Sequence, residues 1–143
     1  MKRILIVEDI PDTLSGIASA LVRKGVAVES VSNIAEAVER LNSIKYDALL
    51  LDWRLPQNEE NPDEIIEDGG AVVLKALSSG KTEALNQDVP VIVVSARPSG
   101  VHQKTVQSFR NCGKPISKMR ILEIRQAIEE TLGLAVPQST SSP

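Results

Sequence analysis

Polar residues that can bind a cation and a phosphoryl group directly follow short apolar segments of this chain. Neighbouring carboxylates repel each other unless a counter-charge is present, and a set of oxygen ligands suits Mg²⁺. A further carboxylate can attack phosphorus, and a lysine and a hydroxyl can hold the phosphoryl oxygens. The residues that fit these roles are Glu8 and Asp9 after residues 3–7, Asp52 after 47–51, Ser95 after 90–94, and Lys114 after 110–113.

Strand-like and helix-like patterns alternate along the sequence and must position these residues. The predicted strands are short, mostly apolar runs, and amphipathic helices with a 3.6-residue period separate them. Strands are predicted at 3–7, 26–31, 47–51, 90–94 and, weakly, 110–113; helices are predicted after Pro11, over 34–41, from Gly70, within 99–109, and from a Ser117 cap through Leu132.

Five such strand–helix units predict an α/β fold with a parallel sheet between two layers of helices. A closed barrel needs about 250 residues, so an open five-stranded sheet suits 143 residues better. The flavodoxin-like order 2-1-3-4-5 places strands 1, 3, 4 and 5 side by side. Their carboxyl ends would then bring the chemistry-bearing residues into one row.

Composition narrows the function classes. Aromatic residues make up 2% of the chain, which argues against a stacking platform for single-stranded nucleic acid. The net charge of −3 gives no general attraction to nucleic acid or membrane, and no DNA-binding motif is present. The single cysteine, Cys112, is expected in a buried strand and excludes an intrachain disulfide. The short apolar run at the N-terminus is neither a signal peptide nor a membrane span, so we expect a cytoplasmic protein.

Four segments together resemble the receiver domain of two-component response regulators: ILIVED, LLLDWRLP, VIVVSA and GKP, in this order. The resemblance covers about residues 3–132, and we expect a domain over 1–134 followed by a flexible Ser/Pro tail or linker stub over 135–143. It implies a CheY-like three-layer fold, Mg²⁺ as cofactor, and phosphotransfer from a histidine kinase or phosphotransfer protein.

The resemblance also implies a role for each matching residue. Asp52 is the phosphoacceptor, Asp9 is the direct Mg²⁺ ligand and Glu8 is the second acid. Ser95 corresponds to the switch hydroxyl. The remaining implied roles are a metal ligand at the backbone carbonyl of Arg54, the phosphate-binding lysine at Lys114, and a cis bond between Lys114 and Pro115.

Several features depart from the family pattern. Residues 57–68 form an insertion with six acids and no base. A solvated insertion is favoured over a lid, a partner contact or an extra metal contact, and the spacing does not fit an EF-hand. The family's switch aromatic would fall at Asn111, with Phe109 two residues earlier, and the segment from Ser95 to Lys114 is unusually short. Trp53 is expected to be partly exposed beside the site.

Arg54 and Arg97 occupy the two positions that tune dephosphorylation in the family. Two guanidinium groups there predict that water is kept from the acyl phosphate and that self-hydrolysis is slow. Residues 97–125, with seven bases and one acid, map to the helix 4–strand 5–helix 5 face. An acidic downstream protein or a second subunit could bind that face, and an ordinary solvated face is equally compatible.

The leading interpretation is a phosphorylated signalling domain rather than an enzyme. One alternative is a receiver-like adaptor that acts without phosphorylation. Another is a Mg²⁺-dependent phosphohydrolase, which is disfavoured because Arg54 stands where such enzymes carry a second Asp. The chain could also be the N-terminal receiver of a longer regulator.

Overall fold

A five-stranded parallel sheet forms the centre of the computed structural model, which describes residues 1–78, 84–97, 105–109 and 112–134. The strand order is β2-β1-β3-β6-β7, which is the predicted order 2-1-3-4-5. The predicted fold class is therefore confirmed. The strands are β1 (Arg3–Val7), β2 (Ala27–Val31), β3 (Ala48–Asp52), β6 (Val91–Ser95) and β7 (Ile116–Ser117).

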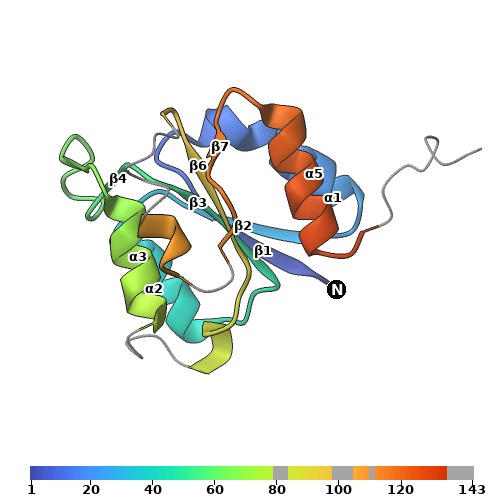
Figure 1. Ribbon diagram of the computed structural model, residues 1–143, viewed down its shortest axis with the longest axis horizontal. Coiled ribbons are helices and arrows are strands. Elements are labelled where there is room, and N and C mark those ends of the chain that lie inside the picture. Colours follow the sequence, from blue (N-terminus) through green and yellow to red (C-terminus); the bar gives the residue numbers. More distant parts are fainter. Residues whose placement is uncertain (79–83, 98–104, 110–111, 135–143) are drawn as a thin grey trace, which may run out of the picture.

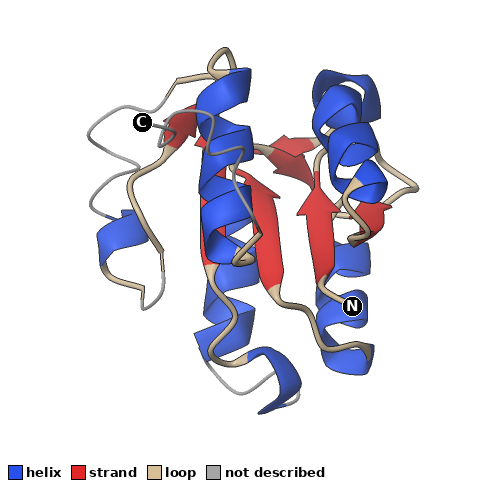
Figure 2. Ribbon diagram, turned by 90° about the vertical axis from the view of Figure 1, so that its right-hand side faces the viewer, coloured by secondary structure: helices blue, strands red, loops and turns tan. Residues whose placement is uncertain are grey.

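Helices cover both faces of this sheet and give the molecule three layers (Figures 1 and 2). The helices α1 and α5 lie on one face, and α2 and α3 lie on the other (Figure 1). Their bounds are α1 (Ser15–Arg23), α2 (Ile34–Ser43), α3 (Gly69–Ser78) and α5 (Ile121–Thr131), with short 3-10 helices η1 (Pro11–Leu14) and η2 (Ala84–Asn86) and a helical turn at 105–107.

Alternate residues of the central strands enter two separate cores because successive side chains of a strand point to opposite faces. In β1, Leu5 and Val7 pack with α2 and α3, whereas Ile4 and Ile6 pack with α1 and α5. β3 is buried along its whole length. A strand covered on both faces reads as a continuous apolar run, which is why the sequence showed these strands clearly.

Local signals place the first two helices. The Asn33 side chain accepts a hydrogen bond from the Glu36 N–H at 2.9 Å and caps α2. Gly25 follows α1 with φ of +84°, a left-handed conformation that glycine adopts without steric cost. Ser117 is not the cap of α5: its hydroxyl accepts from the Met119 N–H, and Arg120 precedes the helix.

The fifth strand lies later in the chain than predicted. Cys112 forms only an isolated bridge with Val91 and is half-buried, and residues 110–111 lie outside the described part. The paired strand is β7, in which Ile116 lies beside Val94 and Ser117 beside Ser95. The polar residue that follows the fifth strand is consequently Lys118 and not Lys114.

The acidic insertion contains a small hairpin of its own. β4 (Leu55–Pro56) and β5 (Ile65–Ile66) pair antiparallel, and the loop between them projects outward from the start of α3 (Figure 1). No helix among the described residues is long and apolar enough to cross a membrane. The predicted tail, 135–143, lies outside those residues.

Candidate functional site

Three carboxylates from two strand ends meet at the carboxyl edge of the sheet. Glu8 and Asp9 follow β1, and Asp52 ends the neighbouring strand β3. One oxygen of each lies within 4.8 Å of the others. Glu8 and Asp52 are almost fully buried, at 3% and 2% exposure, and Asp9 is half-buried. The predicted acidic cluster is thus brought together.

A lysine from the β7–α5 turn joins this cluster. The Nζ of Lys118 donates to Asp52 Oδ2 at 2.7 Å and to Glu8 Oε1 at 3.0 Å. The predicted lysine, Lys114, has an exposed side chain before β7 and makes no described contact with the cluster. The structure therefore places Lys118, and not Lys114, against Asp52.

The cluster carries more negative charge than one ammonium group balances. Burial, together with the neighbouring Glu8 carboxylate, raises the pKa of Asp52 to about 7, although Lys118 acts in the opposite direction. Burial and Asp52 also raise the pKa of Asp9 above its ordinary value. Burial alone would lower the pKa of Lys118, but its bonds to Asp52 and Glu8 raise it. The raised pKa values of the two aspartates thus have two causes, which are burial and the neighbouring carboxylates.

One buried oxygen of the cluster accepts no hydrogen bond from the described residues. Glu8 Oε2 is buried and, although it also lies 3.0 Å from Lys118 Nζ, it accepts no hydrogen bond from any described residue. A buried carboxylate oxygen without a hydrogen bond is costly. A divalent cation among the three carboxylates would pair with this oxygen and balance the charge. The residues present therefore fit a Mg²⁺ ion.

The rim of the site combines a hydroxyl with two guanidinium groups. Ser95 ends β6 and is 4% exposed, and its Oγ accepts the Arg97 N–H at 3.1 Å. Arg54 and Arg97 line a hollow next to it with Glu67 and Ala96. Arg54 Nε lies 2.7 Å from Glu67 Oε2. The structure thus gathers Ser95, Arg54 and Arg97 at one opening.

Comparison with known proteins identifies this combination of fold and acidic site. The family model described as the response regulator receiver domain matches residues 4–124. The chain belongs to this family. Two curated relatives support the assignment: the phosphate regulon transcriptional regulatory protein PhoB of Klebsiella pneumoniae is 30% identical over 96 residues, and the transcriptional regulatory protein PrrA of Mycobacterium leprae is 32% identical over 97.

These alignments cover 67% and 68% of this receiver but only 36% and 35% of the two relatives, so the chain spans about a third of their length. Solved structures agree on the fold. The receiver domain of sensor histidine kinase PA1611 from Pseudomonas aeruginosa, with magnesium in its active-site cleft, superposes with a TM-score of 0.66 at 25% identity, covering 92% of this chain and 98% of that one. The phosphorylated cyanobacterial response regulator RcpA superposes at 0.71 with 24% identity, covering 95% and 98%.

Trp53 was expected to be partly exposed beside the site, but it is buried directly after Asp52. Its side chain is fully buried, and its indole Nε1 donates to Asp68 Oδ1 at 2.8 Å. The first turn of α3 packs tightly against it: a Cβ on Gly70 would lie 2.7 Å from Trp53 Cε3 and 3.0 Å from the Asp52 carbonyl oxygen. Only glycine allows this close approach, which holds the backbone that carries Asp52.

The structure describes one of the two predicted switch positions, Phe109 and Asn111. Asn111 is outside the described residues, and Phe109 is half-buried against the α2–α3 core. With Lys118 at the site, the position three residues earlier is Pro115, which is buried. The expected cis bond before Pro115 is absent, because no cis peptide bond occurs among the described residues.

Sequence reasoning missed Lys118 because the Lys-Pro pair at 114–115 matched the family motif. One signal could have revealed it. The segment from Ser95 to Lys114 was too short for the family, and counting on to Lys118 adds four residues. The same shift would have moved the switch position from Asn111 to Pro115.

Proposed function

We propose that this receiver accepts a phosphoryl group on Asp52 from the phosphohistidine of a histidine kinase or phosphotransfer protein. The observation that carries the proposal is the position of Asp52, a buried carboxylate held by Lys118 among two further acids. A carboxylate in such a setting is a nucleophile with a counter-charge already in place.

The transfer requires little more than positioning and charge balance. An Asp52 oxygen attacks the phosphorus, the bond from phosphorus to the donor nitrogen breaks, and its electron pair stays on the imidazole. Lys118 offsets the charge of the phosphoryl oxygens, and the Ser95 hydroxyl is placed to donate to one of them. Glu8, Asp9, Asp52 and the Arg54 carbonyl would hold Mg²⁺, which supplies further positive charge at the phosphoryl group.

Arg54 and Arg97 lie where they can cover the acyl phosphate. Both line the hollow beside Ser95, and water must reach phosphorus to hydrolyse the bond. We expect slow self-hydrolysis as a result. The double variant Arg54→Ala, Arg97→Ala should lose its phosphoryl group faster than the wild type. An unchanged lifetime would show that the two arginines do not protect the acyl phosphate from water.

Phosphorylation is tested by intact mass after incubation with acetyl phosphate. The expected result is one added phosphoryl group that requires Mg²⁺ and is absent in Asp52→Asn. No adduct with acetyl phosphate or with candidate kinases would favour the adaptor that acts without phosphorylation. Omitting Mg²⁺, or adding a chelator, separates the metal requirement from a general failure of the protein.

We further propose that this receiver is cytoplasmic and transmits its signal by binding another protein. Exposed bases Lys114 and Arg120 flank β7, so an acidic partner or a second copy of the chain fits there. Because the chain spans about a third of its curated relatives, an output domain outside this sequence is equally compatible.

A further inference from the structure

The acidic hairpin is joined residue by residue to the segment that follows Asp52. The β4–β5 pairing continues inward toward the site through side chains, first in an ion pair and then in a hydrogen bond. The successive pairs are Pro56 with Ile65, Leu55 with Ile66, Arg54 with Glu67, and Trp53 with Asp68. The base of the hairpin is therefore joined through side chains to the two residues that directly follow Asp52.

The ion pair of Arg54 and Glu67 lies at the hollow beside Ser95. Both side chains are largely exposed, at 57% and 73%, and both line the hollow that Ser95 and Arg97 share. An exposed ion pair is weak because water solvates both charges. A phosphoryl group on Asp52 would offer the same guanidinium a dianion with several acceptor oxygens, which arginine binds more strongly than a single carboxylate.

We propose that Arg54 exchanges partners, leaving Glu67 for the phosphoryl group, and that Glu67 thereby sets the phosphoryl lifetime. This inference rests on the proposed function. Glu67 acts as a positioning residue, because it touches Arg54 and not the reacting atoms. In the phosphorylated protein it competes with the phosphoryl oxygens for one guanidinium group.

The step that this competition controls is hydrolysis of the acyl phosphate. A water oxygen attacks phosphorus, the bond from phosphorus to the Asp52 oxygen breaks, and its electron pair returns to the carboxylate. The products are inorganic phosphate and Asp52, with the proton released to solvent. Arg54 bound to the phosphoryl group blocks the approach of this water, and Arg54 bound to Glu67 leaves it open.

The test is a double-mutant cycle on the rate of phosphoryl loss from Asp52. The protein is phosphorylated with acetyl phosphate and Mg²⁺, the donor is removed, and the remaining adduct is followed by intact mass. We expect Glu67→Gln to lengthen the lifetime by about two- to fivefold, the range of an exposed ion pair. The same substitution in an Arg54→Ala background should have no effect, and Glu67→Asp should stay near the wild type.

The matched control is Glu59→Gln, which removes the same charge at the hairpin tip, where Glu59 is exposed. An effect of Glu67→Gln that persists without Arg54, or that Glu59→Gln reproduces, overturns the inference, as does an unchanged or shortened lifetime. A wild type that gains no phosphoryl group on Asp52 overturns the proposed function instead, so the two failures are distinct. As a direct readout, the Arg54 Nε–H resonance should shift on phosphorylation in the wild type.

Discussion

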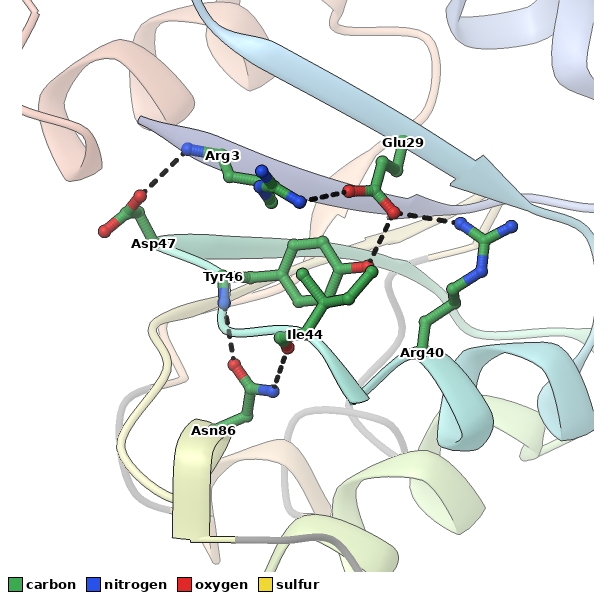
Figure 3. Close-up of polar contacts among 7 residues, drawn as sticks. All are labelled: Arg3, Glu29, Arg40, Ile44, Tyr46, Asp47 and Asn86. Carbon is green, nitrogen blue, oxygen red and sulfur yellow. Dashed lines mark hydrogen bonds and ion pairs between the residues drawn. The ribbon is translucent and has the colours of Figure 1, made fainter. Parts of the chain in front are cut away.

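Two groups of partly buried charges lie in this receiver, one at the carboxyl edge of the sheet and one near its amino edge. In the second group, Glu29 of β2 accepts hydrogen bonds from Arg3, Arg40 and the Tyr46 hydroxyl at 2.9–3.0 Å (Figure 3). One carboxylate there meets two guanidinium groups and a phenol. At the carboxyl edge, three carboxylates share one ammonium group, and an oxygen of Glu8 has no hydrogen-bond partner among the described residues.

The amino-edge network extends to buried backbone groups. Asn86, 1% exposed, accepts the Tyr46 N–H at 2.9 Å and donates to the carbonyl oxygen of Ile44 at 2.7 Å (Figure 3). It also donates to the carbonyl oxygen of Leu41 at 2.7 Å. Asp47 accepts the Arg3 N–H at 2.8 Å. Each of these polar groups has a partner within the protein, as expected of a structural network.

Buried charge alone therefore does not mark a functional site in this molecule. What distinguishes the carboxyl edge is that burial, together with the neighbouring Glu8 carboxylate, raises the pKa of Asp52 to about 7 despite the ammonium group of Lys118. A site of this kind gains stability from a cation or a bound group, whereas the amino-edge network is complete without one. Substitutions at the carboxyl edge should therefore affect mainly phosphorylation, and substitutions at the amino edge should affect mainly stability.

The largest effect is expected at Lys118. Lys118→Met removes the ammonium group that lies 2.7 Å from Asp52 Oδ2, so phosphorylation by acetyl phosphate should slow by about a hundredfold or more. Lys114→Met is the matched control and should react at nearly the wild-type rate, because the Lys114 side chain is exposed and Lys118 already occupies the place beside Asp52. The rate is followed by intact mass with Mg²⁺ present. The reverse order of the two variants would restore Lys114 as the phosphate-binding lysine.

The next largest effect is on stability at the amino edge. Asn86→Ala leaves the Tyr46 N–H and two carbonyl oxygens without their partner, so the free energy of unfolding should fall by about 2–3 kcal/mol. Urea denaturation measures this change. Asn58→Ala is the control, since its hydrogen bonds to Asn61 are exposed, and it should cost less than about 0.5 kcal/mol.

Asp52→Asn tests the carboxyl edge, where a substitution should abolish phosphorylation without lowering stability. Without Mg²⁺ it removes one charge from an overcrowded cluster, so the free energy of unfolding should stay equal or rise while phosphorylation is lost. A loss of stability comparable to that of Asn86→Ala would show that the two edges do not differ in the way proposed.

The central strands and the acids that follow them could be predicted from the sequence because their signals are local. β1, β3 and β6 are buried on both faces, so they appear as uninterrupted apolar runs that end at Glu8, Asp52 and Ser95. The topology of a parallel α/β sheet then brings those ends together. The strand order alone was therefore enough to predict that the acids at these strand ends lie together.

The lysine could not be predicted in the same way, because β7 has only two paired residues and its position depends on tertiary contact with β6. The motif at 114–115 outweighed the spacing, and the paired residues Ile116 and Ser117 carry no strong strand pattern. The amino-edge network was also missed. It joins Glu29, Tyr46 and Asn86 across separate elements, and no local pattern marks such contacts.

The smallest predicted effect concerns Tyr46, the single tyrosine of the chain. Burial and the hydrogen bond to Glu29 raise the pKa of its phenol from 10.0 to about 12. Because the folded pKa lies above the unfolded one, this contribution to stability is present below pH 10 and is lost as the pH rises toward 12. Ultraviolet absorbance of the phenolate gives the midpoint directly. Glu29→Gln should lower it by about one pH unit, because a neutral amide no longer repels the phenolate. A midpoint near 10 in the folded wild type would contradict a closed amino-edge network, and the contrast between the two edges would then rest on Asn86 alone.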